Sequence, residues 1–325
     1  MGEKVKPIKR PTLARAPEDR AHVDRLIELL ESVLAGDRAV EELLALGPQV
    51  VPDVARFLLE SPPRSLALPR CRAVRVLGEL GACAALLMYF HQYWKPADAS
   101  VLLAEDAVRS AAAQALLHCA SAEVFPTLLE AVRDRATGGL VEAVGEFRRP
   151  EALPILFELL EDDLCCEQAK TALRKVRQAA QSFAVLLLRG QAELSIAGPG
   201  TSRRRRATLQ LLAEWGAATS NWSDLRGYLW DEDADCVIAA AQIGFPIASE
   251  SQQAEIVSAL IEGAAKINGA QEIEVIELLD EHGAIARQVA ERVAAYRRLR
   301  GEATNWQSPF WRVLHHLLDE TLDGR

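Results

Sequence analysis

The chain of 325 residues is 50% hydrophobic, 26% charged and 6% aromatic, which is the composition of a folded globular protein. Its apolar residues are mainly alanine and leucine, a bias that favours closely packed helices and argues against a β-rich fold. Lysine and arginine total 37 against 46 aspartate and glutamate, and the resulting net charge of −9 argues against a dedicated nucleic-acid-binding protein, whose surface is basic.

The N-terminal segment 1–18 is basic, contains three prolines and shows no helical period, so it predicts a mobile leader. It lacks the apolar core of a secretory signal, and no window reaches the roughly 18 to 20 apolar residues of a membrane helix. We therefore expect a soluble, cytoplasmic protein without a membrane span. The first helix is expected to begin near Pro17 or Glu18 and to continue to Gly36.

The six cysteines are too few for a disulfide scaffold in so long a chain, and none is spaced as Cys-x-x-Cys. We interpret them as thiols that pack as small apolar side chains in a reducing compartment. The adjacent Cys165 and Cys166 fit a helix that faces alanine neighbours better than they fit a redox pair.

An internal repeat is the main signal in the sequence, because segments 115–130 and 143–158 align without gaps. In each, a helix ends and a second opens with the pattern Glu-x-x-Pro-x-Leu-x-Glu, which places proline in the first helical turn. Equivalent positions, the repeat anchors, recur at spacings of 31, 39, 28, 29, 39 and 28 residues. The anchors are Ala45, Val76, Ala115, Ala143, Ala172, Leu211 and Ala239.

Segments 73–81 and 106–116 resemble the second helix of HEAT repeats, particularly the short bacterial kind also found in phycobilisome lyases. The resemblance is clear over residues 38–245 and weak to about residue 300. It implies an all-α fold: a right-handed α-solenoid of about seven to nine helix pairs over residues 19–300. The Gly- and Pro-containing segment 190–202 is the candidate junction between two halves of this solenoid.

An aromatic insertion, residues 88–96, separates two of the repeats. Insertions in solenoids often lie on the binding face, and aromatic residues with a polar group are common interface anchors. We therefore treat this insertion as a candidate partner-binding segment; its proposed anchors are Tyr89, His91, Tyr93 and Trp94. The alternative is that its apolar residues form the core of a lengthened helix.

Four consecutive arginines, Arg203, Arg204, Arg205 and Arg206, open a helix after the 190–202 segment. Positive charge at a helix N-terminus opposes the helix dipole, so something acidic is expected to neutralise it. That acidic group is either a carboxylate of this chain or an acidic partner.

The C-terminal segment 301–325 is expected to form a capping helix over the last repeat. Ser308 is a good N-cap residue and Pro309 suits the first helical position. An apolar stripe then follows, formed by Phe310, Leu314, Leu317 and Leu318.

No arrangement of residues forms a catalytic signature, so we expect neither an enzyme nor a cofactor. The consecutive His315 and His316 point in different directions on a helix, whereas metal-binding pairs prefer the i, i+4 spacing. His91 and His118 have no neighbouring pattern of nucleophile and base. No metal site is proposed.

The second helices of HEAT-like repeats line the concave face of the solenoid, so the resemblance identifies a ladder of partner-binding positions one before and three after each anchor. The ladder residues are Arg75, Glu79, Gln114, His118, Glu142, Glu146, Thr171, Lys175, Gln210 and Glu214. Their mixed charge suits a protein or peptide partner better than a polyanion.

Three functions follow from these features. The first is a non-enzymatic scaffold or adaptor that binds a protein or peptide partner through the ladder and the insertion. The second is an accessory subunit of a chromophore-lyase-like enzyme, which a ligand pocket with a histidine or cysteine at its base would favour. The third is a HEAT-like alkylpurine DNA glycosylase, which a continuous basic groove would favour.

The glycosylase alternative depends on one aromatic and acidic cluster. The aromatic members are Trp215, Trp222, Tyr228 and Trp230, and the acidic members are Asp231, Asp233 and Asp235. The resemblance is weak, because no shared motif covers these positions and an acidic groove repels phosphates.

Overall fold

The structure is a computed structural model that describes residues 17–92, 95–190, 201–216, 218–302, 305 and 307–319. Every regular element in these ranges is a helix, as the alanine- and leucine-rich composition predicts. The chain divides into two compact units, unit 1 (Met1–Ala143) and unit 2 (Val144–Arg325), and the candidate junction at 190–202 falls within unit 2. Residues 1–16 of the expected leader and residues 191–200 of that junction lie outside the described residues.

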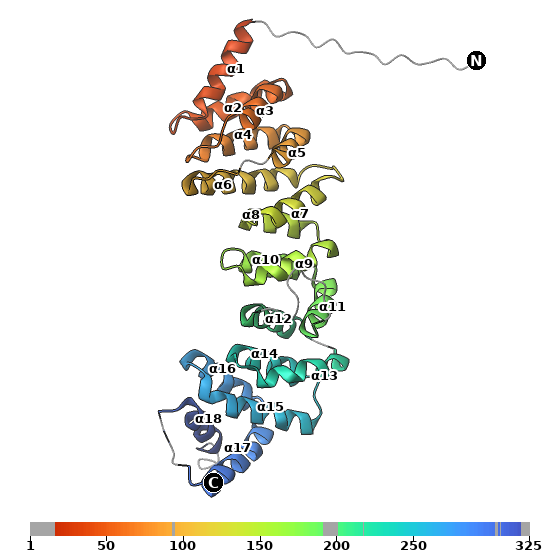
Figure 1. The fold of residues 1–325 in the computed structure, drawn as a ribbon, viewed down its shortest axis with the longest axis vertical. Helices are drawn as coiled ribbons and strands as arrows, with labels where there is room; N and C mark the ends of the chain where they lie inside the picture. The colour runs from red at the N-terminus through yellow and green to blue at the C-terminus, as the bar shows by residue number, and fades with distance from the viewer. Residues whose placement is uncertain are drawn as a thin grey trace, which may run out of the picture. The chain divides into compact units, whose positions relative to one another are not determined.

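Unit 1 contains helices that alternate between two layers (Figure 1). In one layer α2 packs against α4 and α4 against α6; in the other α3 packs against α5 and α5 against α7. The bounds are α1 Pro17–Leu29, α2 Gly36–Leu46, α3 Val51–Glu60, α4 Leu68–Glu79, α5 Cys83–His91, α6 Ala99–Leu116 and α7 Val124–Asp134. Helix α8, Gly138–Glu146, contains the boundary residues of the two units.

Unit 2 repeats the same alternation. Helices α10, α12, α14, α16 and α18 pack in succession, and α15 packs against α17 on the other side. The longer helices are α10 Cys166–Lys175, α11 Arg177–Leu188, α12 Ser202–Trp215, α14 Ala234–Gly244, α15 Glu250–Gly263, α16 Gly269–Asp280, α17 Gly283–Leu299 and α18 Pro309–Asp319. The shorter helices are α9 Leu153–Glu158 and α13 Trp222–Leu225, and η3 (Leu159–Glu161) and η5 (Arg226–Trp230) are 3₁₀ helices.

The first helix is shorter than the sequence predicts. Helix α1 ends at Leu29, and Gly36 begins α2. The reason is the buried guanidinium of Arg72, which donates to the carbonyl oxygens of Leu30 (2.9 Å) and Ser32 (2.8 Å) and pairs with Asp37. A Cβ atom at position 36 would lie 1.9 Å from Arg72 Nη1, so only glycine leaves room for this contact. Helix α18, in contrast, begins at Pro309 as predicted, and Phe310, Leu314 and Leu317 of its stripe are buried.

Other buried arginines also bond to the ends of neighbouring helices. Arg70 on α4 donates to the carbonyl oxygens of Leu58 (2.9 Å) and Ser61 (2.7 Å) at the end of α3. Arg109 on α6 donates to the carbonyl of Ala131 (2.9 Å) near the end of α7. The last carbonyls of a helix have no partner within it and carry partial negative charge, so these guanidinium groups stabilise the helix ends and fix the layers together.

Two glycines allow close contact at equivalent repeat positions. A Cβ atom on Gly78 of α4 would lie 2.8 Å from the Cβ of Ala115 on α6, and one on Gly145 of α8 would lie 2.6 Å from the Cβ of Ala172 on α10. In both pairs the glycine lies two residues after one repeat anchor, and the alanine is the next anchor. The same glycine–alanine contact therefore occurs at the same position of the repeat in unit 1 and in unit 2.

Gly145→Ala is expected to lower the free energy of unfolding by about 1–3 kcal/mol, because the new methyl group overpacks the contact with Ala172. This loss exceeds the gain of at most about 1 kcal/mol from the higher helix propensity of alanine. Urea titration followed by circular dichroism measures the change. Gly263→Ala on α15 is the matched control, since its Cβ would meet nothing nearer than 3.8 Å; the prediction is wrong if the two variants are equally stable.

Candidate functional site

A groove of about 680 Å³ lies between α4 and α6 in unit 1. We call it the α4/α6 groove. Its lining residues are Cys71, Val74, Arg75, Gly78, Glu79, Ala111, Gln114, Ala115, Leu117 and His118. The contact between Gly78 and Ala115 sets the separation of its two walls, and small or apolar side chains form most of its surface. The groove is thus an apolar surface between two rows of polar residues.

The polar rim of the α4/α6 groove consists of four residues that the repeat predicts as ladder positions. Arg75 forms ion pairs with Glu79 (2.7 Å) and with Glu41 of α2 (2.9 Å). The hydrogen bond to Glu79 raises the pKa of Arg75 most, and the charge of Glu41 raises it further. On the other wall, Gln114 donates to the carbonyl of Gly139 (3.2 Å), and His118 is exposed. The structure therefore brings Arg75, Glu79, Gln114 and His118 together around one concavity.

The remaining ladder residues do not line this groove. Glu142 and Gln210 are exposed. In unit 2, Lys175 pairs with Glu146 (2.5 Å), and this hydrogen bond lowers the pKa of Glu146. Glu214 pairs with Arg174 (2.9 Å), a residue that the ladder does not include. These ion pairs join α10 to α8 and to α12, so part of the predicted ladder links helices of unit 2.

The aromatic insertion is mostly core in its described part. Tyr89 is only 2% exposed and Phe90 is buried, so the prediction that Tyr89 is a surface anchor is wrong. Its hydroxyl donates to Glu105 Oε1 of α6 at 2.6 Å, which satisfies the phenol inside the unit. His91 is exposed and lines a smaller cavity of about 270 Å³. Tyr93 and Trp94 lie outside the described residues.

A buried polar cluster joins α4, α5 and α6. Glu105, 1% exposed, accepts from Tyr89 and from Arg70 Nη2 at 3.2 Å. Burial, and then the negative charge of Glu105, raises the pKa of Tyr89, so the phenol stays neutral and remains a hydrogen-bond donor. Sequence reasoning missed this cluster. The only signal was a glutamate on a helix face that otherwise carries buried residues such as Val108 and Ala112.

The four consecutive arginines bind carboxylates of this chain. Arg203 pairs with Asp163, Arg204 with Glu161 (2.8 Å), Arg205 with Asp231 (3.1 Å), and Arg206 with Asp233 (2.6 Å) and Asp235 (3.0 Å). Of the two alternatives for the acidic group, carboxylates of this chain are therefore the one that the structure shows. The candidate contact with an acidic partner at Arg203, Arg204, Arg205 and Arg206 is corrected accordingly, because these guanidinium groups already have anionic neighbours.

Glu161 explains how positive charge is tolerated at the start of α12. It accepts a hydrogen bond from the backbone N–H of Thr201 (2.9 Å) and pairs with the fully buried Arg204. Partial burial raises the pKa of Glu161, but Thr201 and Arg204 together outweigh it and leave the pKa lowered. A carboxylate at this helix end therefore compensates both the arginine and the free N–H groups.

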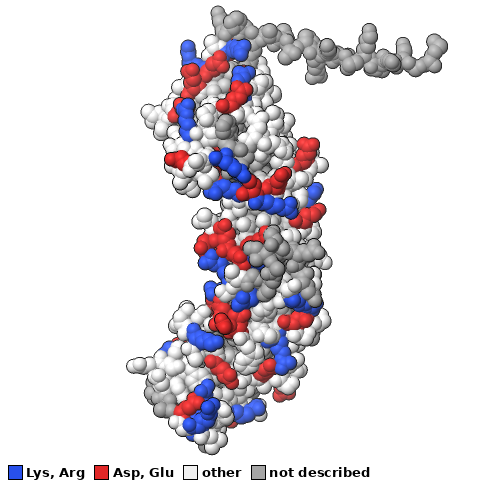
Figure 2. Space-filling view, in the orientation of Figure 1, with Lys and Arg blue, Asp and Glu red and all other residues white. Residues whose placement is uncertain are grey.

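The aromatic and acidic cluster of the glycosylase alternative has structural partners. Trp215 and Trp222 are 5% and 3% exposed, and Tyr228 donates to the carbonyl of Leu188 (2.8 Å). Asp231 and Asp233 form the ion pairs with α12 given above. On the face drawn in Figure 2, basic and acidic side chains are interspersed within each unit. This surface does not match the continuous basic groove that DNA requires.

A disulfide joins Cys83, at the start of α5, to Cys119, just after α6 (Cα–Cα 5.9 Å). The interpretation of all six cysteines as thiols is therefore wrong. Because disulfides are rare in a reducing compartment, the cysteines no longer support the expected cytoplasmic location. Cys119 directly follows the rim residue His118, so the disulfide restrains the chain at one end of the α4/α6 groove. Cys71 in the groove is a free thiol; burial, and then Glu105, raises its pKa, which disfavours the nucleophilic thiolate.

Within the described ranges, no group of three or more histidine, cysteine, aspartate or glutamate residues is placed to hold a metal ion. No described helix combines the length and the apolar character that crossing a membrane requires. Comparison with known proteins found no matching family model, no matching curated protein and no matching solved structure. The geometry of the chain itself is therefore the basis for a functional proposal.

Proposed function

We propose that this chain is a non-enzymatic scaffold or adaptor that binds a protein or peptide partner through the α4/α6 groove. In this proposal the helices form a right-handed α-solenoid of HEAT-like repeats, and the groove is part of its concave face. The observation that carries the proposal is the groove itself, where four ladder residues surround an apolar surface.

The alternating contacts of the helices support the repeat architecture. In unit 1 each layer is built from every second helix, and in unit 2 α10, α12, α14, α16 and α18 pack in the same way. The contacts Gly78–Ala115 and Gly145–Ala172 occur at the same position of the repeat. A helix pair cannot bury its own apolar face, so stacking of successive pairs supplies the core.

The chemistry of the α4/α6 groove favours a peptide over a polyanion. Its surface offers Ala111 and Leu117 to apolar side chains, while its rim carries both signs of charge on Arg75 and Glu79. Binding sites for peptides combine an apolar centre with a polar rim that fixes register and specificity. A rim with a glutamate would repel a phosphate chain.

The test is quantitative affinity capture from native extract with the wild type and with Arg75→Glu. Arg75→Glu places two like charges at the i, i+4 spacing on the groove rim and is expected to lower capture of the wild-type partners at least about tenfold, a loss of about 1.4 kcal/mol. Arg38→Glu is the matched control, because Arg38 also forms an exposed i, i+4 ion pair with a glutamate, Glu42 (2.8 Å), but does not line the groove.

Arg38→Glu should capture the partners as the wild type does, and both variants should keep the thermal stability of the wild type within a few degrees. Two results contradict the proposal. One is equal capture by Arg75→Glu and the wild type; the other is a wild type that captures nothing above background.

A second candidate function is favoured by the presence of Cys71 and His118 in the same groove. These are the residue types expected at the base of a ligand pocket in an accessory subunit of a chromophore-lyase-like enzyme. In that case the groove holds a small molecule, and native mass spectrometry of protein purified from its own cells would show an added mass that Ala111→Trp removes. The raised pKa of Cys71 weighs against covalent attachment at this thiol.

A further inference from the structure

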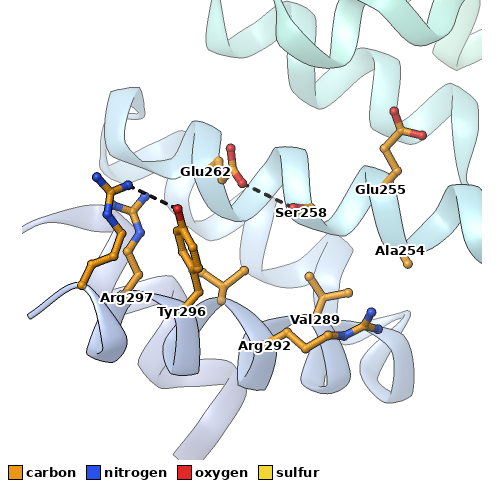
Figure 3. A pocket seen from close by; sticks show the side chains of 10 residues that line it. Ala254, Glu255, Ser258, Glu262, Val289, Arg292, Tyr296 and Arg297 are labelled. Atoms are coloured by element: carbon orange, nitrogen blue, oxygen red, sulfur yellow. Dashed lines mark hydrogen bonds between the residues drawn. The ribbon is translucent and has the colours of Figure 1, made fainter. Parts of the chain in front are cut away.

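A second groove, of about 590 Å³, lies in unit 2 between α15 and α17 (Figure 3). We call it the α15/α17 groove. Helix α15 contributes Ala254, Glu255, Ser258 and Glu262, and helix α17 contributes Val289, Arg292, Val293, Tyr296, Arg297 and Arg300. One wall therefore carries acidic groups and the other carries basic groups, with Ala254 and Val293 as partly exposed apolar surface between them.

Some of these charges are already compensated. Glu255 pairs with Arg226 (2.6 Å), outside the groove. Arg297 pairs with Glu302 (2.5 Å) and lies over the ring of Phe310 at 4.9 Å. Arg300 shares the same Glu302 at 3.9 Å and is hydrogen-bonded to the hydroxyl of Tyr296 (3.4 Å), so one carboxylate serves two guanidinium groups.

Two charges in the α15/α17 groove are not compensated. Arg292 donates to the carbonyl of Gln288 on its own helix (3.3 Å), and within the described residues it forms no ion pair. Glu262 on the opposite wall is bonded to the hydroxyl of Ser258 at 3.5 Å, and among the same residues it likewise has no cationic partner. Because Arg297 and Arg300 share one carboxylate, the α17 wall keeps an excess of positive charge.

We propose that the α15/α17 groove binds a peptide segment in which one carboxylate side chain lies beside aliphatic residues. The carboxylate pairs with Arg292, whose guanidinium donates, among the described residues, only to a backbone carbonyl and can supply charge-assisted hydrogen bonds. The aliphatic residues of the peptide cover Ala254 and Val293, and the ring of Tyr296, 57% exposed, gains a neighbour. Glu262 repels a ligand with several negative charges, so the groove favours a peptide with one carboxylate over a nucleotide or a polyphosphate.

This site is independent of the α4/α6 groove, because it lies in the other unit and shares no residue with it. A chain with both sites binds two different segments. It would then hold two partners, or two parts of one partner. Binding at the α15/α17 groove is identified by its requirement for a carboxylate side chain in the peptide.

The test uses the full chain immobilised and a positional-scanning library of N-acetyl hexapeptide amides, whose blocked ends leave only side-chain charge. The wild type is expected to select aspartate or glutamate at one position and leucine, isoleucine or valine at a neighbouring one. Arg292→Glu is expected to weaken the selected peptide at least about tenfold and to shift selection at that position to lysine or arginine. Glu262→Lys is expected to strengthen the acidic peptide and to create affinity for tripolyphosphate.

Arg298→Glu is the matched control, since Arg298 is an exposed arginine of the same helix that does not line the groove. It should keep the selection of the wild type, and so should Arg75→Glu in the other unit, even if the α4/α6 groove proves to bind nothing. The proposal is overturned if the wild type selects no acidic residue, if Arg292→Glu and Arg298→Glu behave alike, or if tripolyphosphate displaces the acidic peptide from the wild type.

Discussion

Glu105→Leu is expected to lower the free energy of unfolding by about 3–5 kcal/mol, because it leaves a buried positive charge without its carboxylate. Arg70 is 4% exposed and would keep only the carbonyl oxygens of Leu58 and Ser61 as hydrogen-bond acceptors, with no carboxylate to balance its charge. The buried hydroxyl of Tyr89 would also lose its acceptor at 2.6 Å, and an unsatisfied buried donor adds to the loss. Urea titration followed by circular dichroism measures the loss, and hydrogen exchange of α4 and α6 peptides localises it to unit 1.

Three variants control this result. Glu105→Gln retains an oxygen acceptor and should lose less than Glu105→Leu. Glu42→Leu removes an exposed glutamate from an ion pair and should change stability by no more than about 0.5 kcal/mol. Arg70→Met combined with Glu105→Leu should recover part of the loss, since no unpaired charge remains. A Glu105→Leu protein within about 1 kcal/mol of the wild type would contradict the role of Glu105 as the buried counter-ion.

The disulfide between Cys83 and Cys119 closes a loop with a sequence separation of 36 residues. In the chain-entropy treatment, opening a loop of this length lowers the free energy of unfolding by about 4 kcal/mol. Protein refolded in a glutathione redox buffer should therefore lose stability on reduction, or when both cysteines are replaced by serine. Urea titration with and without a phosphine reductant measures this difference.

The Cys83→Ser/Cys119→Ser protein should not respond to the reductant, whereas Cys71→Ser, which removes a free thiol, should respond as the wild type does. Peptide mapping without reductant should recover the two half-cystine peptides joined. Alkylation of Cys83 and Cys119 as free thiols in the oxidised preparation would show that the bridge does not form.

The sequence predicts the helical elements well where the evidence is local. Composition is sufficient to predict an all-helical fold, and the Ser308–Pro309 pair marks the start of α18 correctly. The repeat anchors also place Arg75, Glu79, Gln114 and His118 around one groove, because the period fixes which face of α4 and α6 each residue occupies.

What the sequence does not predict depends on contacts between distant residues. The end of α1 depends on Arg72, which reaches the carbonyl of Leu30 from 42 residues away. The pairing of Cys83 with Cys119, and the acceptor that Glu105 provides for Tyr89, arise only when α5 and α6 pack together. Residue type and spacing alone could not show whether Tyr89 is an interface anchor or a core residue, because both environments suit an aromatic ring with a polar end.

Photo-cross-linking from the α4/α6 groove tests the proposed function most directly. A benzoylphenylalanine at Gln114 lies on the groove rim, and the same residue at Leu103, 67% exposed on the same helix, lies outside the groove. Irradiation in the native cells should give a defined adduct with a protein partner at position 114, absent at position 103 and lost when Arg75→Glu is added. Equal adducts at both positions, or none at position 114, would contradict binding of a partner in this groove.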